Sequence, residues 1–170
     1  STMDAQDYQP TRLQVAKNVM SQFIEERVND RVGVIIFGTS PYVLIPPSFD
    51  QTSTINSINA IDSFLYSIKR SGLDQELRMT AIGSGLGLAV DQLKDSDAES
   101  KVVILLTDGE NNAGEIAPVT AAEIAKTFDV RVYTIGLVAK TNRTTYNNPN
   151  FDRSELQKIA NVTGGKFFSA

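Results

Sequence analysis

Residues 101–112 read Lys-Val-Val-Ile-Leu-Leu-Thr-Asp-Gly-Glu-Asn-Asn, and this stretch decides the fold. The five residues from Val102 to Leu106 are all apolar, at successive and not at alternate positions. Strands with this pattern are covered by helices on both faces and belong mostly to parallel sheets. Residues 31–37 (RVGVIIF) show the same pattern. Two such strands predict an α/β domain.

Strand-like and helix-like segments alternate along the remaining chain. Helices are expected over residues 13–24, 55–68, 82–93, 120–128 and 154–160, and strands over residues 31–37, 42–45, 101–107, 130–137 and 166–168. Between Val138 and Asp152 the chain is rich in Asn, Thr and Pro, which predicts a loop. This alternation predicts a doubly wound, mostly parallel sheet with helices on both faces, forming a single domain over residues 1–170.

Two local signals set the boundaries of the second strand and second helix. Pro46-Pro47 is expected to end the short strand that begins at Tyr42, because proline lacks a backbone N–H. Asp50 or Thr52 can cap the following helix. The apolar stripe of that helix is Ile55, Ile58, Ile61, Leu65 and Ile68.

Composition excludes several function classes. The 170 residues include no cysteine and no histidine, so thiolate sites, disulfides and Ser-His-Asp catalysis are absent. The net charge of −4 argues against a nucleic-acid-binding surface. No segment approaches the roughly 20 apolar residues of a membrane span. A cation site in this chain would have to use oxygen ligands.

Ligands of doubly wound domains bind beyond the carboxyl ends of the strands. Residues 107–112 lie at such an end and combine two carboxylates with two amides, which suit a hard divalent cation. An ordinary turn at Asp108-Gly109 is the alternative interpretation, with about equal weight. The glycines of residues 83–87 are expected to let a helix pack tightly, and a phosphate-binding loop is a weaker alternative.

The chain resembles the von Willebrand factor A family, and within it the bacterial BatA/BatB-type membrane-anchored proteins. The matching stretches follow one another along nearly the whole chain. They are residues 3–13 (MDAQDYQPTRL), 30–37 (DRVGVIIF), 79–83 (MTAIG), 103–114 (VILLTDGENNAG), 131–136 (RVYTIG) and 163–168 (TGGKFF).

The resemblance implies a metal-ion-dependent adhesion site at the C-terminal edge of the sheet. Its ligands by motif position are Thr2, Thr80 and Asp108, and its ion is Mg²⁺, or alternatively Mn²⁺ or Ca²⁺. The family's motif begins with an Asp-x-Ser, for which residues 1–170 contain no counterpart, so the metal site is expected to be incomplete within this chain. In the family, a partner protein's Asp or Glu carboxylate fills the open position on the ion.

The resemblance therefore implies a protein-interaction module and not an enzyme. It also implies a bacterial cell-envelope location, with the domain in the periplasm and anchored to the inner membrane through segments outside this chain. Two alternatives remain. One is a metal-free scaffold that binds partners through a sheet edge or residues 141–150, and the other is a metal-assisted hydrolase using Asp108 and Glu110.

The family places its first strand in the middle of the sheet, between residues 32–37 and 102–106. No stretch of residues 1–170 corresponds to that strand, so we expect an N-terminally truncated domain or another segment in its place. Direct pairing of the two flanking strands with each other would contradict this expectation.

Overall fold

The computed structural model describes residues 12–72, 79–107, 111–137 and 152–169. Its helices are α1 (Arg12–Glu25), α2 (Gln51–Asn59), α3 (Ile61–Arg70), α4 (Ile82–Leu93), α5 (Pro118–Thr127) and α6 (Arg153–Val162). Its strands are β1 (Val32–Phe37), β2 (Pro41–Ser48), β3 (Lys101–Thr107), β4 (Val130–Gly136) and β5 (Phe167–Ser169). The loop predicted between Val138 and Asp152 falls almost entirely outside the described residues. The mixed α/β fold agrees with the sequence prediction.

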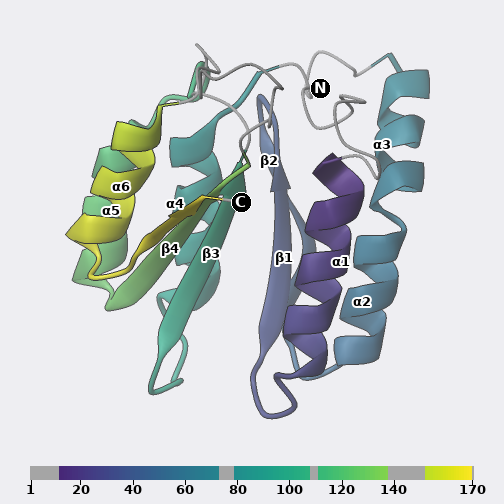
Figure 1. Ribbon diagram of the computed structural model, residues 1–170, viewed down its shortest axis with the longest axis horizontal. Coiled ribbons are helices and arrows are strands. Elements are labelled where there is room, and N and C mark those ends of the chain that lie inside the picture. Colours follow the sequence, from purple (N-terminus) through teal and green to yellow (C-terminus); the bar gives the residue numbers. More distant parts are fainter. Residues whose placement is uncertain (1–11, 73–78, 108–110, 138–151, 170) are drawn as a thin grey trace.

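The strands form two sheets. β1 and β2 pair antiparallel, whereas β3, β4 and β5 form a parallel sheet in that order. Figure 1 shows α1, α2 and α3 beside the β1–β2 pair and α4, α5 and α6 beside the parallel sheet. β1 and β3 are not hydrogen-bonded to each other, as expected from the sequence, and among the described residues no strand lies between them.

Two apolar clusters correspond to these two groups of elements. In the first, Leu86 of α4 and Ile159 of α6 pack with Leu105 of β3 and Val132 of β4. The second cluster brings α1, α2 and α3 onto β1; its buried residues are Ile24, Ile58 and Ile61. Helix α4 contacts strands of both sheets and so connects the two clusters.

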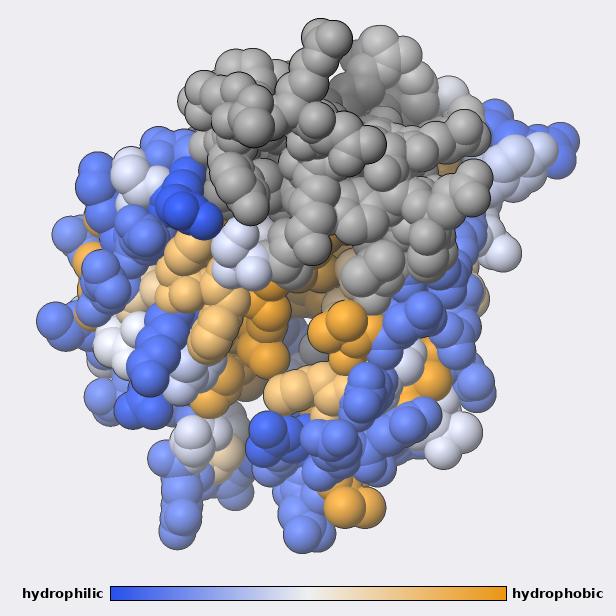
Figure 2. Space-filling view, in the orientation of Figure 1, coloured by the Kyte–Doolittle hydropathy of each residue, from blue (hydrophilic) through white to orange (hydrophobic). Residues whose placement is uncertain are grey.

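One face of the parallel sheet leaves apolar side chains accessible. Val102 and Ile104 of β3 are each 43% exposed. Leu105 of the same strand packs against the helices and is 4% exposed. Figure 2 shows apolar surface on this side of the molecule, between the two groups of helices. Within the described residues, α4, α5 and α6 therefore cover β3 on one side only.

The single helix expected over residues 55–68 is wrong, because the chain forms α2 and α3 with a break at Ala60. Lys17 of α1 contacts the chain on both sides of this break. Its ammonium group donates to the carbonyl oxygen of Asn59 at 2.8 Å and to the carboxylate of Asp62 at 2.5 Å. The side chain of Lys17 is 4% exposed, so its buried charge needs these oxygens. The cap prediction at Asp50 is confirmed, since its carboxylate accepts from the Ser53 N–H at 2.9 Å.

The expected end of the second strand at Pro46-Pro47 is also wrong, because β2 continues to Ser48. Its pairing with β1 is irregular there: Val34 faces Ile45, whereas Val32 faces Ser48. The prolines thus lie in a bulge, where a missing N–H interrupts no regular ladder bond.

Candidate strand-end site

The start of helix α4 is held by side chains from another loop. Its N-cap residue is Ala81, which has no side chain able to accept a hydrogen bond. Instead, the amide oxygen of Asn111 accepts from the Ile82 N–H at 2.8 Å. Asn111 therefore supplies from the loop after β3 the acceptor that a local Ser, Thr or Asp usually provides.

Asn112 holds the neighbouring residue Thr80 through both of its backbone groups. The Thr80 N–H donates to the side-chain oxygen of Asn112 at 2.7 Å. In return, the carbonyl oxygen of Thr80 accepts from the backbone N–H of Asn112 at 3.0 Å and from that of Ala113 at 3.3 Å. Thr80 is consequently fixed in position against the loop that follows β3.

A third loop joins the same place. The Ala81 N–H donates to the carbonyl oxygen of Gly38, the residue directly after β1, at 2.8 Å. We call this meeting of Gly38, Thr80–Ile82 and Asn111–Ala113 the strand-end junction. Because β1 and β3 both lead into it, the junction lies at the carboxyl ends of the strands, where the sequence predicted ligand binding.

Glycine allows the close approach of these loops. Gly114 has φ of +90°, and a Cβ atom added there would lie 2.6 Å from the hydroxyl oxygen of Ser84 in α4. Gly85 faces β1, where an added Cβ would lie 3.0 Å from the ring of Phe37. The expectation that the glycines of residues 83–87 permit tight helix packing is therefore confirmed at Gly85.

The structure places one of the three predicted metal ligands. Thr80 is half-buried in the strand-end junction, whereas Thr2 and Asp108 lie outside the described residues. Thr107, which precedes Asp108 in the chain, is the buried last residue of β3. Thr80 and the end of β3 are thus brought to the same edge of the molecule.

The sequence also offered the amides of Asn111 and Asn112 as oxygen groups for a cation. In the structure both side-chain oxygens accept backbone N–H groups of the α4 loop. Their role is therefore to connect the two loops. Sequence reasoning missed it, although Ala81 at the N-cap position was a usable signal that the cap comes from elsewhere.

The strand-end junction offers an oxygen ligand of the kind that a hard divalent cation prefers. Among the described residues, the hydroxyl of Thr80 makes no hydrogen bond, so it is available as an oxygen ligand. The described part of the chain contains no group of three acidic, histidine or cysteine residues able to hold a metal. A carboxylate ligand at this edge would therefore come from residues such as Asp108, beyond the described ranges.

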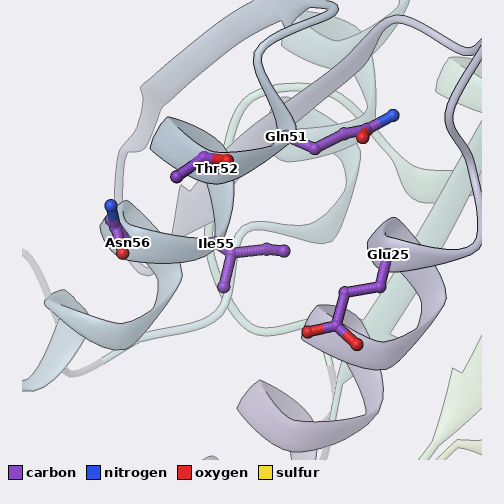
Figure 3. Close-up of a pocket in the computed structure, with 5 residues that line it drawn as sticks. All are labelled: Glu25, Gln51, Thr52, Ile55 and Asn56. Carbon is purple, nitrogen blue, oxygen red and sulfur yellow. The ribbon is translucent and has the colours of Figure 1, made fainter.

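A separate surface pocket lies between α1 and α2. It has a volume of about 300 Å³, and Figure 3 shows its lining by Glu25, Gln51, Thr52, Ile55 and Asn56. Glu25 ends α1 and Gln51 begins α2. These two helix ends lie far from the carboxyl ends of the strands, so the pocket is separate from the strand-end junction (Figure 1). One carboxylate among neutral side chains gives this pocket no evident chemistry.

Shifted pKa values occur at surface groups outside the junction. Hydrogen bonds from Ser53 lower the pKa of Asp50, and the hydrogen bond from Arg31 lowers the pKa of Asp97. The hydrogen bond with Asp91 raises the pKa of Lys94. These shifts reflect helix capping and surface ion pairs.

Comparison with known proteins agrees with the mixed α/β fold described above. The family model of the von Willebrand factor type A domain matches residues 1–110. An uncharacterised protein of Borreliella burgdorferi is 26% identical over 93% of this chain and 47% of its own length. The chain spans about half the length of the curated relatives it matches. Within the described residues, no helix has the length and apolar character needed to cross a membrane.

Solved structures show the same fold. BatB from Bacteroides thetaiotaomicron has a TM-score of 0.79 and 26% identity, covering 99% of this chain and 84% of that one. Proximal thread matrix protein 1 from the mussel byssus has a TM-score of 0.68 and 24% identity, covering 94% of this chain and 37% of that one. This chain belongs to the von Willebrand factor type A domain family, and within that family it resembles the BatB-type proteins.

Proposed function

We propose that this domain is a protein-interaction module that binds an acidic group of a partner protein through a divalent cation at the strand-end junction. The observation that carries the proposal is the contact between Thr80 and Asn112. It joins Thr80, whose hydroxyl has no hydrogen-bond partner among the described residues, to the loop that follows Asp108. This contact lies at the edge where this class of fold binds ligands.

The proposed ligands are the hydroxyl of Thr80, the carboxylate of Asp108 and the hydroxyl of Thr2. Oxygen donors of this kind suit Mg²⁺ or Mn²⁺, and the ion would supply a positive centre for a partner's carboxylate. A motif Asp-x-Ser from outside residues 1–170 would complete the set. The mussel protein named above has a zinc-occupied site of this type, which motivates a metal titration here.

We propose further that the domain is not an enzyme and that it works at a bacterial cell envelope. The absence of histidine and cysteine removes the usual nucleophile and base pairs. The envelope location is supported by the likeness to BatB and to an aerotolerance-related membrane protein of Bacteroides fragilis, which is 26% identical.

A metal-free scaffold is the second candidate function. The specific observation in its favour is the exposed apolar side of β3, at Val102 and Ile104, next to a strand edge that is unpaired among the described residues. Such an edge can accept an extended segment of a partner.

Calorimetric titration of Mn²⁺ into the natural full-length protein separates the two candidates. We expect saturable binding that weakens at least about tenfold in Asp108→Ala, because a carboxylate that binds the ion or orients its ligands is lost. Asp95→Ala, which removes a carboxylate from the turn after α4, should leave the affinity unchanged. Equal affinities of wild type and Asp108→Ala would overturn the metal site and favour the scaffold.

A further inference from the structure

We propose that Asn112 is a positioning residue for the cation site, and that Asn111 independently caps helix α4. This inference rests on the proposed function, since it concerns how Thr80 is presented to the ion. The two asparagines are adjacent in the chain, yet they hold different backbone groups.

The role of Asn112 follows from the geometry of its hydrogen bonds. Its side-chain oxygen accepts from the Thr80 N–H at 2.7 Å, and its own N–H donates to the Thr80 carbonyl oxygen at 3.0 Å. Both polar backbone groups of Thr80 are therefore used by one residue. Within the described ranges these bonds leave the hydroxyl of Thr80 without a partner. The backbone that carries the hydroxyl cannot shift without breaking its bonds to Asn112.

The same contacts couple two loops that would each carry a ligand. Asn112 is four residues beyond Asp108 in the chain, while Thr80 precedes α4. A hydroxyl and a carboxylate must keep a fixed separation to bind one ion of strict geometry, such as Mg²⁺. Asn112 fixes Thr80 relative to the loop that follows β3, and its side-chain oxygen serves this contact by accepting the Thr80 N–H.

Asn111 performs a different task nearby. Its side-chain oxygen accepts from the Ile82 N–H at 2.8 Å, in a helix whose N-cap residue is Ala81. Loss of this bond frays the first turn of α4 but leaves the two bonds of Thr80 to Asn112 in place. The two asparagines thus offer a matched pair of variants, one acting on the helix end and one on the ligand-bearing residue.

Amide hydrogen exchange followed by NMR tests these assignments without any metal. We expect Asn112→Ala to speed exchange of the Thr80 amide about tenfold or more, while the Ile82 amide keeps its protection. Asn111→Ala should do the reverse. Asn112→Asp retains an oxygen acceptor and should restore the protection of Thr80. Unchanged exchange at Thr80 in Asn112→Ala would overturn the assignment, whether or not the protein binds metal.

A double-mutant cycle with Mn²⁺ affinity tests whether Asn112 acts through Thr80. Alone, Asn112→Ala should weaken binding about tenfold, in the range seen when groups that orient metal ligands are removed. In a Thr80→Ala background it should cause no additional loss. The control Asn161→Ala, at an exposed position of α6, should leave the affinity unchanged. An equal loss in both backgrounds would overturn positioning through Thr80.

Absence of Mn²⁺ binding by the wild-type protein would contradict the proposed function instead, and the exchange result alone would then decide the roles of the asparagines.

Discussion

Gly83 in the first turn of α4 lies directly against the carbonyl group of Ile116, the second residue before α5. A Cβ atom added to Gly83 would lie 1.9 Å from the Ile116 carbonyl oxygen and 3.0 Å from the carbonyl carbon of Ala117. Backbone atoms cannot move aside as the end of a side chain can. The close approach of α4 to this segment therefore depends on the absence of a side chain at Gly83.

We expect Gly83→Ala to lower the free energy of unfolding by about 1–3 kcal/mol, because the two backbones must separate. Gly87 in the same helix provides the matched control, since its added Cβ would lie 3.4 Å from the flexible end of the Ile116 side chain. Gly87→Ala should be neutral or stabilise by up to about 1 kcal/mol, as alanine favours helices. Urea unfolding of both variants measures the difference. Equal effects would show that contact with Ile116 does not restrict position 83.

Lys17 is expected to stabilise the connection between α2 and α3 through its contact with Asp62. Asp62→Ala leaves a buried ammonium group with one carbonyl partner, so we expect a loss of about 1.5–3 kcal/mol in the free energy of unfolding. Asp91→Ala removes the exposed pair with Lys94 and should change stability little. Urea unfolding compares the two. A similarly small effect of both would mean that Lys17 reaches water after its partner is removed.

Asp152 caps α6 and should make stability depend on pH. Its carboxylate accepts from the N–H groups of Ser154 and Glu155, at 2.8 and 3.1 Å. The largest cause of its lowered pKa is a hydrogen bond with the side chain of Ser154, followed by the bond from the Glu155 N–H. A pKa lower in the folded state than in the unfolded state stabilises the fold above the usual aspartate pKa of about 3.9. That contribution is lost as pH falls through the folded value.

We therefore expect Asp152→Ala to lower the free energy of unfolding by about 1 kcal/mol near neutral pH. The difference from wild type should begin to shrink as pH falls below about 3.9, and it should vanish once pH has passed the lowered pKa at which the folded carboxylate becomes protonated. Asp152→Asn keeps an acceptor and should lose less. Urea unfolding across this pH range provides the measurement, and a difference that stays constant with pH would contradict the role of the ionised carboxylate.

The exposed side of β3 is expected to promote association of chains comprising residues 1–170. Ile104→Lys should reduce association seen by light scattering, because it places a charge on exposed apolar surface, and should change the free energy of unfolding by less than about 0.5 kcal/mol. Leu105→Ala, at a buried neighbouring position, should instead destabilise by about 2–5 kcal/mol. Unchanged scattering of Ile104→Lys would exclude this surface as the cause of association.

Much of the fold could be predicted from the sequence because its signals are local. The successive apolar residues of Val102 to Leu106 correspond to β3, and the predicted cap at Asp50 is present. The division between α2 and α3 was not predicted, and the Lys17 side chain that contacts it comes from more than 40 residues away in the chain, beyond the reach of a local pattern. The extension of β2 past Pro47 depends on its pairing with β1, which is also not a local property.

The candidate site shows the same limit. Thr80 was predicted from its motif position, and the structure places it at the edge where ligands were expected. That metal binds there remains a prediction. The asparagines of residues 111 and 112 looked like possible cation donors because the sequence shows which groups exist but not which backbone N–H each one faces.

Paramagnetic line broadening by Mn²⁺ tests the central claim most directly, because it locates the ion. We expect small additions of Mn²⁺ to the natural full-length protein to broaden first the amide signals of Thr80, Ala81 and Asn112, while Gln51 in the pocket beside α1 stays sharp. In Asp108→Ala that selective broadening should disappear. Broadening centred on Gln51, or spread evenly over exposed acidic residues in wild type, would contradict a cation site at the strand-end junction.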